Sequence, residues 1–179
     1  MTGIDATALR ELQRPLKEKY REDPPAAVTP LHAVAGFEAG DEGVVTCTVQ
    51  GWSGPVRAGL HPATGGDGGD ACSGDMLLEA LLACSGVTLR SVATSMGLPV
   101  RSARFEASAT FDARGTLGVS RDAPVGCTGY RVVAEVALDD DVDDAALARL
   151  ADLTERYCVV GQSLREPVTI EVRRAAAGH

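Results

Sequence analysis

The run Met76-Leu-Leu-Glu-Ala-Leu-Leu-Ala-Cys84 decides how this chain folds. Between residues 76 and 89 the only charged side chain is Glu79, and apolar residues fall on every side of the helical wheel. A helix that is apolar all round belongs in a protein core or in a membrane. The uncharged run is shorter than the ~20 residues that a bilayer requires, and the apolar residues are interrupted at Ser85-Gly86. We therefore predict a buried central helix over residues 73–96.

The composition sets broad limits on function. The 179 residues suffice for one substantial core or for one domain with an extension. The apolar fraction of 45% and charged fraction of 23% are those of an ordinary soluble protein. A net charge of −8 argues against nucleic acid as a partner, because phosphate binding requires a basic surface. The first 20 residues are amphipathic and have no apolar signal core. We expect a cytoplasmic protein without nucleic-acid or membrane partners.

The remaining pattern predicts an α+β fold in two parts. Residues 1–27 form an extension with an amphipathic helix over 5–21, which Pro15 should kink or split. Residues 28–179 form the main domain. Strands are predicted over 32–37, 44–49, 56–60, 100–111, 129–138 and 167–173, joined by a glycine-rich connection at 61–70 and turns at 39–43 and 112–115. A second helix is predicted over 145–157, capped by the acidic run before it. Because the strands cluster in antiparallel-looking pairs, repeated βαβ units are not expected.

The cysteines give no framework of their own. There are five, an odd number without Cys-x-x-Cys spacing, so a zinc cluster or a secreted disulfide scaffold is not expected. The three histidines are too dispersed for a metal site. A thiol inside a core helix, such as Cys84, is most often a small hydrophobe. Cys72 at the helix start could be reactive, because helix N-termini lower a thiol pKa, but a small buried residue is the default. Cys47 is interpreted as a strand residue with no special role. Cys127 lies in an irregular segment, and its position suggests no function.

Two cysteine segments together resemble one known family. The first is the pattern Leu-Leu-x-Ala-Leu-Leu-Ala-Cys-x-x-x-Thr-Leu over residues 77–89, and the second is the helix at 145–157 that leads into Cys158. The chain is similar to the OsmC/Ohr family of osmotically inducible and organic hydroperoxide resistance proteins over roughly residues 28–173. The resemblance implies an intertwined homodimer with long central helices wrapped by antiparallel sheets. It also implies a thiol peroxidase that uses neither metal nor other cofactor.

The resemblance assigns Cys84 as the peroxidatic cysteine and Cys158 as the resolving one. A thiolate attacks the O–O bond and becomes a sulfenic acid, which a second thiol protects from over-oxidation by condensing with it. Electrons would come from a dithiol reductant that the sequence does not name. We expect an apolar wall that suits the alkyl part of an organic hydroperoxide, formed by Met76, Leu77, Leu81 and Val87.

Two departures from the family pattern leave a second hypothesis open. Family members commonly carry Cys-Pro-Val-Ser where this chain has Cys158-Val-Val-Gly. The peroxidases also hold the first cysteine ionised with an arginine and a glutamate, and no carboxylate stands at the expected place near residues 61–62. Arg57 is the nearest candidate for the arginine by region, with a surface arginine as the competing interpretation. The alternative function is therefore a non-catalytic small-molecule binding protein of the same fold.

Overall fold

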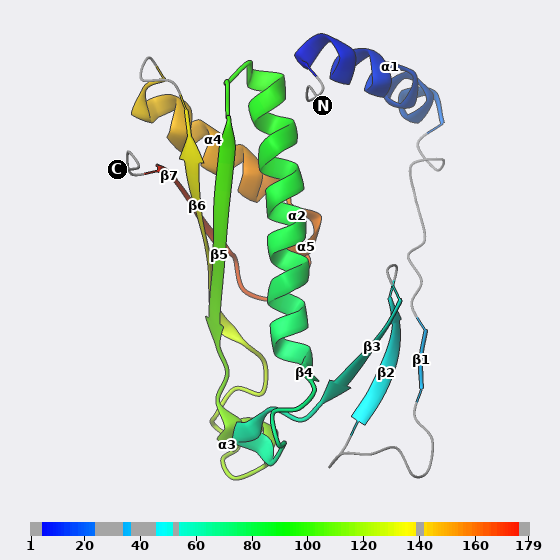
Figure 1. Cartoon of the computed structure of the whole chain (residues 1–179), viewed down its shortest axis with the longest axis vertical. Helices are drawn as coiled ribbons and strands as arrows, with labels where there is room; N and C mark the ends of the chain where they lie inside the picture. Colours follow the sequence, from blue (N-terminus) through cyan, green and yellow to red (C-terminus); the bar gives the residue numbers. More distant parts are fainter. Residues whose placement is uncertain (1–4, 24–33, 37–45, 52–53, 139–141, 176–179) are drawn as a thin grey trace. The chain divides into compact units, whose positions relative to one another are not determined.

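The structure is a computed structural model that describes residues 5–23, 34–36, 46–51, 54–138 and 142–175 (Figure 1). The chain divides into two compact units. The first unit comprises Met1–Pro30, Leu81–Ala107 and Arg131–His179, and the second comprises Leu31–Ala80 and Ser108–Tyr130. The predicted turn at 39–43 lies outside the described residues. The division into an extension at 1–27 and a main domain at 28–179 stays a prediction.

The first unit is built on a sheet with the strand order β5-β6-β7. Its elements are α1 (Ala6–Glu22), most of α2 (Ser73–Met96), most of β5 (Ser102–Thr110) and β6 (Thr128–Ala137), α4 (Asp144–Tyr157), α5 (Val159–Gln162) and β7 (Thr169–Arg174). β6 and β7 are parallel, with Arg131 opposite Thr169. β5 runs antiparallel to β6, since the chain just before β5 meets the end of β6 through the bond from Arg101 N–H to Ala137 O, 2.9 Å.

One face of this sheet forms the core. Along β6 the side chains of Val132, Ala134 and Val136 are buried, while the alternate residues Arg131 and Glu135 point to the other face. The buried cluster joins this face to α2 and α4, and its members from those helices are Leu89, Ala93, Leu147 and Leu150. The opposite face carries ion pairs between β6 and β7, formed by Arg131 with Glu171 and by Arg173 with Glu135.

The central helix α2 is only partly covered. Its fully buried positions recur every four residues at Leu81, Ser85, Leu89 and Ala93, which is one stripe of the helix. Of its most hydrophobic stretch only 22% is buried, and by length and composition alone the helix could cross a membrane. Val87 leaves 73% of its surface exposed. One sheet covers one side of α2, as expected for a single chain, and burial of its other sides by a second subunit stays a prediction.

The second unit holds a sheet with the strand order β1-β2-β3-β4, formed by Val34–Gly36, Thr46–Gly51, Gly54–Gly59 and Ala71–Cys72. β1, β2 and β3 pair antiparallel, whereas the two-residue β4 pairs parallel with β3. The glycine-rich connection includes the 3-10 helix η2 (Pro62–Thr64), which begins at His61. A Cβ on Gly66 would lie 1.7 Å from the carbonyl oxygen of Leu60, so only glycine fits at this close approach.

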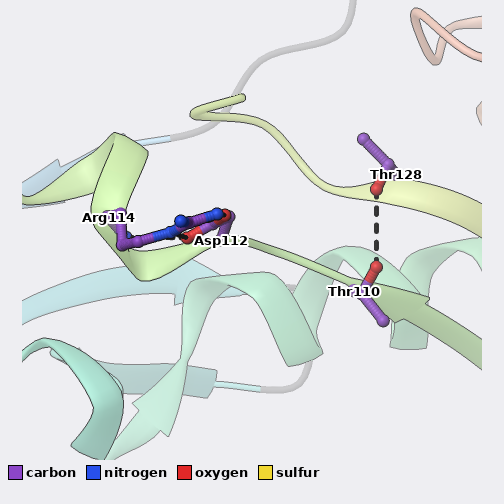
Figure 2. Close-up of polar contacts among 4 residues, drawn as sticks. All are labelled: Thr110, Asp112, Arg114 and Thr128. Carbon is purple, nitrogen blue, oxygen red and sulfur yellow. Dashed lines mark hydrogen bonds and ion pairs between the residues drawn. The ribbon is translucent and has the colours of Figure 1, made fainter. Parts of the chain in front are cut away.

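The end of β5 is followed by a short helix, α3 (Ala113–Thr116), where a simple turn was predicted. Asp112 begins it by accepting the N–H of Arg114 at 3.0 Å (Figure 2). The guanidinium of Arg114 also hydrogen-bonds this carboxylate and lowers the pKa of Asp112 to about 2. The only local signal for this helix is a capping aspartate, Asp112. Because the same residue is equally common in a turn, the sequence does not distinguish a four-residue helix from a turn.

The other predicted elements agree with the structure at the level of type and order. The α+β class is confirmed, and the central helix runs over the predicted residues 73–96. α1 continues through Pro15 without ending there. α4 begins after Asp143, whose carboxylate accepts the N–H of Ala146 at 2.7 Å, as the acidic run predicted. The parallel pairings of β3 with β4 and of β6 with β7 differ from the expected antiparallel sheets.

Candidate functional site

Cys84 lies in the middle of α2 and is half-buried. Thr88 follows it by four residues, so the two side chains share one face of the helix. Cys158 ends α4, is fully buried and begins the short helix α5. The sulfur of Cys158 accepts the N–H of Gly161 at 3.3 Å. The first unit thus brings together the two cysteines that the resemblance paired.

Four donors surround the Cys84 sulfur. Burial raises the pKa of this thiol, but hydrogen bonds from the Val160 N–H, the Cys158 thiol, the Thr88 hydroxyl and the Val159 N–H outweigh burial. The pKa of Cys84 therefore lies below the ordinary thiol value. Donors of this kind favour the charged form, because each hydrogen bond is stronger to a thiolate than to a neutral thiol.

The environment of Cys158 acts in the opposite direction. Burial raises the pKa of the Cys158 thiol, and the hydrogen bond to Cys84 together with the negative charge there raises it further. The Gly161 N–H and the Ser85 hydroxyl offset part of this effect. Of the two thiols, Cys84 therefore loses its proton first, and Cys158 is the neutral thiol that donates to it.

Sequence reasoning missed Thr88 and the two backbone donors. Hydroxyls elsewhere on α2 bond back to a carbonyl four residues earlier, as Ser85 does to Leu81 and Thr94 does to Arg90. The Thr88 hydroxyl instead meets the sulfur of Cys84. Its signal was present in the Cys-x-x-x-Thr spacing. The N–H groups of Val159 and Val160 had no signal, because any residue except proline provides one.

The predicted arginine lies in the second unit. The Nε of Arg57 is 2.7 Å from Oδ1 of Asp70, and its Nη2 is 3.2 Å from Oδ2 of the same carboxylate. This ion pair joins β3 to the residue before β4. The role of Arg57 beside the Cys84 thiolate stays a prediction.

The predicted apolar wall is distributed over both units. Met76 and Leu77 are half-buried in the second unit, and Leu81 is fully buried in the first. Val87 lines two open grooves of the first unit. One of about 540 Å³ runs between α2 and β5, and one of about 550 Å³ also includes Thr88 and Leu153. Since Leu81 faces the core and Val87 faces solvent, these two do not line one surface.

The described ranges hold no group of three or more His, Cys, Asp or Glu side chains placed to bind a metal ion. The side chains that meet at Cys84 and Cys158 are thiols and hydroxyls. Such a set can form a thiolate, transfer a proton between sulfurs and join the two sulfurs as a disulfide.

Several solved structures share this fold, and the match covers nearly the whole length of each of them. An OsmC-like protein of unknown function from Vibrio cholerae superposes with a TM-score of 0.66 at 14% identity, covering 82% of this chain and 100% of that one. An organic hydroperoxide resistance protein from Elizabethkingia anophelis gives 0.63 at 14% identity, with 82% and 99% covered. One from Legionella pneumophila gives 0.58 at 13% identity, with 83% and 100% covered. At these identities the likeness shows the fold.

The sequence itself gives the family. A search of curated proteins gave no match. Residues 66–173 match the family of OsmC-like proteins, a stretch that is more than half of the chain and includes α2, Cys84 and Cys158. The apolar helix α2 lies within this matched stretch, and a single helix of its length and composition is weak evidence for a membrane span. The chain belongs to the OsmC-like protein family.

Proposed function

We propose that this protein is a cysteine-based peroxidase that reduces organic hydroperoxides, with Cys84 as the attacking thiolate and Cys158 as the resolving thiol. The observation that carries the proposal is the opposite direction of the two pKa shifts in one hydrogen-bonded pair. The thiolate is the nucleophilic form of cysteine. Structural neighbours named organic hydroperoxide resistance proteins make a redox or hydroperoxide-resistance role the expectation for the family.

In the first step the Cys84 thiolate attacks the terminal oxygen of the hydroperoxide and the O–O bond breaks. The alkoxide leaves as an alcohol after taking the proton of the Cys158 thiol, which is the donor already hydrogen-bonded to Cys84. Cys84 becomes a sulfenic acid, and Cys158 becomes a thiolate. The proton transfer therefore prepares the second nucleophile at the moment it is needed.

In the second step the Cys158 thiolate attacks the Cys84 sulfur, hydroxide leaves and takes a proton from solvent, and a disulfide forms. The sum is one hydroperoxide and two thiols giving one alcohol, one water and one disulfide. A dithiol reductant then exchanges with the disulfide and restores both thiols. Because Cys158 already contacts Cys84 before oxidation, this step requires no large movement of α5.

The donors around Cys84 support a peroxidase that lacks the family's glutamate. Two backbone N–H groups, one hydroxyl and one thiol supply the stabilisation that a charged pair provides elsewhere in the family. Backbone donors held by a helix turn are fixed in place, so they need no reorganisation when charge develops. The groove that includes Thr88 combines apolar side chains such as Val87 and Leu153 with polar ones such as Ser91. Its apolar part suits the alkyl group of an organic hydroperoxide.

We also propose a homodimer in the cytoplasm. The uncovered side of α2 is apolar, and exposed apolar patches of this kind mark protein interfaces. Light scattering at micromolar concentration should give the mass of two chains. A stable, folded monomer would contradict the dimer and leave the thiol chemistry to be judged by itself.

The test of the peroxidase is the rate at which wild-type protein consumes cumene hydroperoxide in stopped flow at pH 7. A thiol with the ordinary pKa of about 8.5 is only a few per cent ionised there, so the protein should react far faster than free cysteine. One equivalent should consume two thiols per chain and link Cys84 to Cys158. A rate equal to that of free cysteine would favour the non-catalytic binding protein, for which the groove is the binding site.

A further inference from the structure

The second unit contains another pair of thiols that the proposed peroxidase reaction does not use. A cavity of about 310 Å³ lies within this unit. The residues of its lining that matter here are His61, Cys72, Leu78, Thr110, Phe111 and Cys127. Both cysteines are free and half-buried, so small molecules can reach them.

Two contacts hold the chain around this cavity. The Oγ1 atoms of Thr110 and Thr128 are 3.4 Å apart (Figure 2), which places the end of β5 beside the start of β6 and therefore beside Cys127. The ring of His61 meets the ring of Phe111 edge-on, with centroids 5.2 Å apart.

Contacts on the other side of the cavity fix the position of Cys72. Its backbone pairs with Gly59 on β3, immediately before α2 begins. η2, which His61 caps, packs against α3, which follows Phe111. The segment before α2 and the segment between β5 and β6 are thus fastened to each other, and each contributes one thiol to the cavity they enclose.

We propose that Cys72 and Cys127 form a second dithiol site, which an organic hydroperoxide oxidises to a disulfide within the chain. One sulfur attacks the O–O bond, an alcohol leaves and a sulfenic acid forms. The other sulfur then displaces water, so that two thiols and one hydroperoxide give a disulfide, an alcohol and water. The apolar part of the lining, at Leu78 and Phe111, accepts the alkyl group. No step involves Cys84, so this inference does not depend on the proposed peroxidase.

The disulfide would change how the second unit unfolds. It would join the residue before α2 to the residue before β6 and close the chain between them into a loop. Closing a long loop removes conformations from the unfolded chain. The oxidised protein should therefore melt at a higher temperature than the reduced protein, and a dithiol should reverse the shift.

The experiment uses the full chain with Cys84→Ser and Cys158→Ser, which removes the first pair. After excess cumene hydroperoxide, alkylation and peptide mapping should find Cys72 linked to Cys127, with Cys47 still alkylated. Separate sulfinic acids at the two positions, or a link through Cys47, would overturn the proposal. The same mapping on wild-type protein decides the matter if the double variant does not fold.

Phenylarsine oxide gives a second readout, because it bridges two neighbouring thiols with loss of water. In the double-serine background one arsenical should bind per chain. Adding Cys72→Ser or Cys127→Ser should abolish binding, whereas adding Cys47→Ser as the matched control should leave it unchanged. Lack of binding in the parent double variant would show that the two sulfurs do not approach each other and would overturn the proposal.

Discussion

The two thiol pairs of this protein differ in what surrounds them. The Cys84 sulfur receives two backbone N–H groups and a hydroxyl, and its partner Cys158 is fully buried. Cys72 and Cys127 are instead both half-buried in the wall of a cavity. Proximity of two thiols is enough for a disulfide, but distinct roles require unequal surroundings. The first pair has an assigned nucleophile, whereas either member of the second pair could attack.

The largest effect is expected from Cys84→Ser. If the donors around this sulfur create the reactivity, the substitution should reduce dithiol-dependent peroxide consumption to the uncatalysed rate, because the nucleophile is gone. Stopped flow with cumene hydroperoxide measures it, and Cys47→Ser on β2 is the matched control. Turnover close to that of the wild type in Cys84→Ser would mean that another thiol is the nucleophile. The difference in surroundings between the two pairs would then not explain their reactivity.

Cys158→Ser should have a smaller and different effect. Cys84 can still reach the sulfenic acid, so one equivalent of peroxide should react, followed by a stall. Without a resolving thiol beside it, Cys84 should gain further oxygen atoms and become a sulfinic acid, which mass spectrometry detects. Serine keeps a hydrogen-bond donor beside Cys84, but its hydroxyl is a far weaker acid than a thiol. The leaving alkoxide therefore gains its proton less easily, and the first equivalent should react more slowly than in the wild type. Sustained turnover would mean that a different thiol resolves Cys84.

Sequence alone predicted the elements with strong local signals. The central helix follows from an apolar run in which Glu79 is the only charged residue, and the start of α4 follows from an aspartate that caps it. The two-residue β4 and the parallel pairing of β6 with β7 could not be predicted, because a strand's partner is decided by tertiary contacts.

The sequence predicted those parts of the candidate site that are side chains in a recognisable sequence pattern. The resemblance paired Cys84 with Cys158, and the structure places them in hydrogen-bond contact. The stabilising groups at Val159 and Val160 are backbone amides, which the sequence cannot distinguish from any other amides. The resemblance also directed attention to Arg57, which forms an ion pair with Asp70, and its role beside Cys84 stays a prediction.

Thr88→Val tests whether the hydroxyl helps to make Cys84 the nucleophile. Removing this donor should raise the pKa of Cys84, so less thiolate is present at pH 7. The pH profile of Cys84 alkylation should therefore shift to higher pH. A hydrogen bond to a charged group contributes roughly 1.5 kcal/mol or more, which corresponds to about tenfold slower alkylation of Cys84 at pH 7.

The measurement is iodoacetamide labelling of the Cys84 peptide as a function of pH. Thr94→Val is the matched control on the same helix, because the Thr94 hydroxyl bonds to Arg90 O at 2.8 Å. Thr88→Ser should restore the profile. An unchanged profile in Thr88→Val would leave the backbone amides and Cys158 as the groups that lower the pKa.

The smallest effect is expected from Val159→Pro, which restores the proline that family members commonly carry after the second cysteine. The backbone accepts it: Cys158 is extended, with φ −73° and ψ 102°, and Val159 is the first residue of α5, where proline is favoured. Val159 is 67% exposed, so a proline ring there would contact few other atoms.

The substitution removes one N–H donor to Cys84, the weakest of the four. The pKa of Cys84 should therefore rise less than in Thr88→Val, and the melting temperature should not fall. A larger loss of reactivity than in Thr88→Val would make the Val159 amide the principal donor and would mean that this chain depends on a group that its proline-bearing relatives lack.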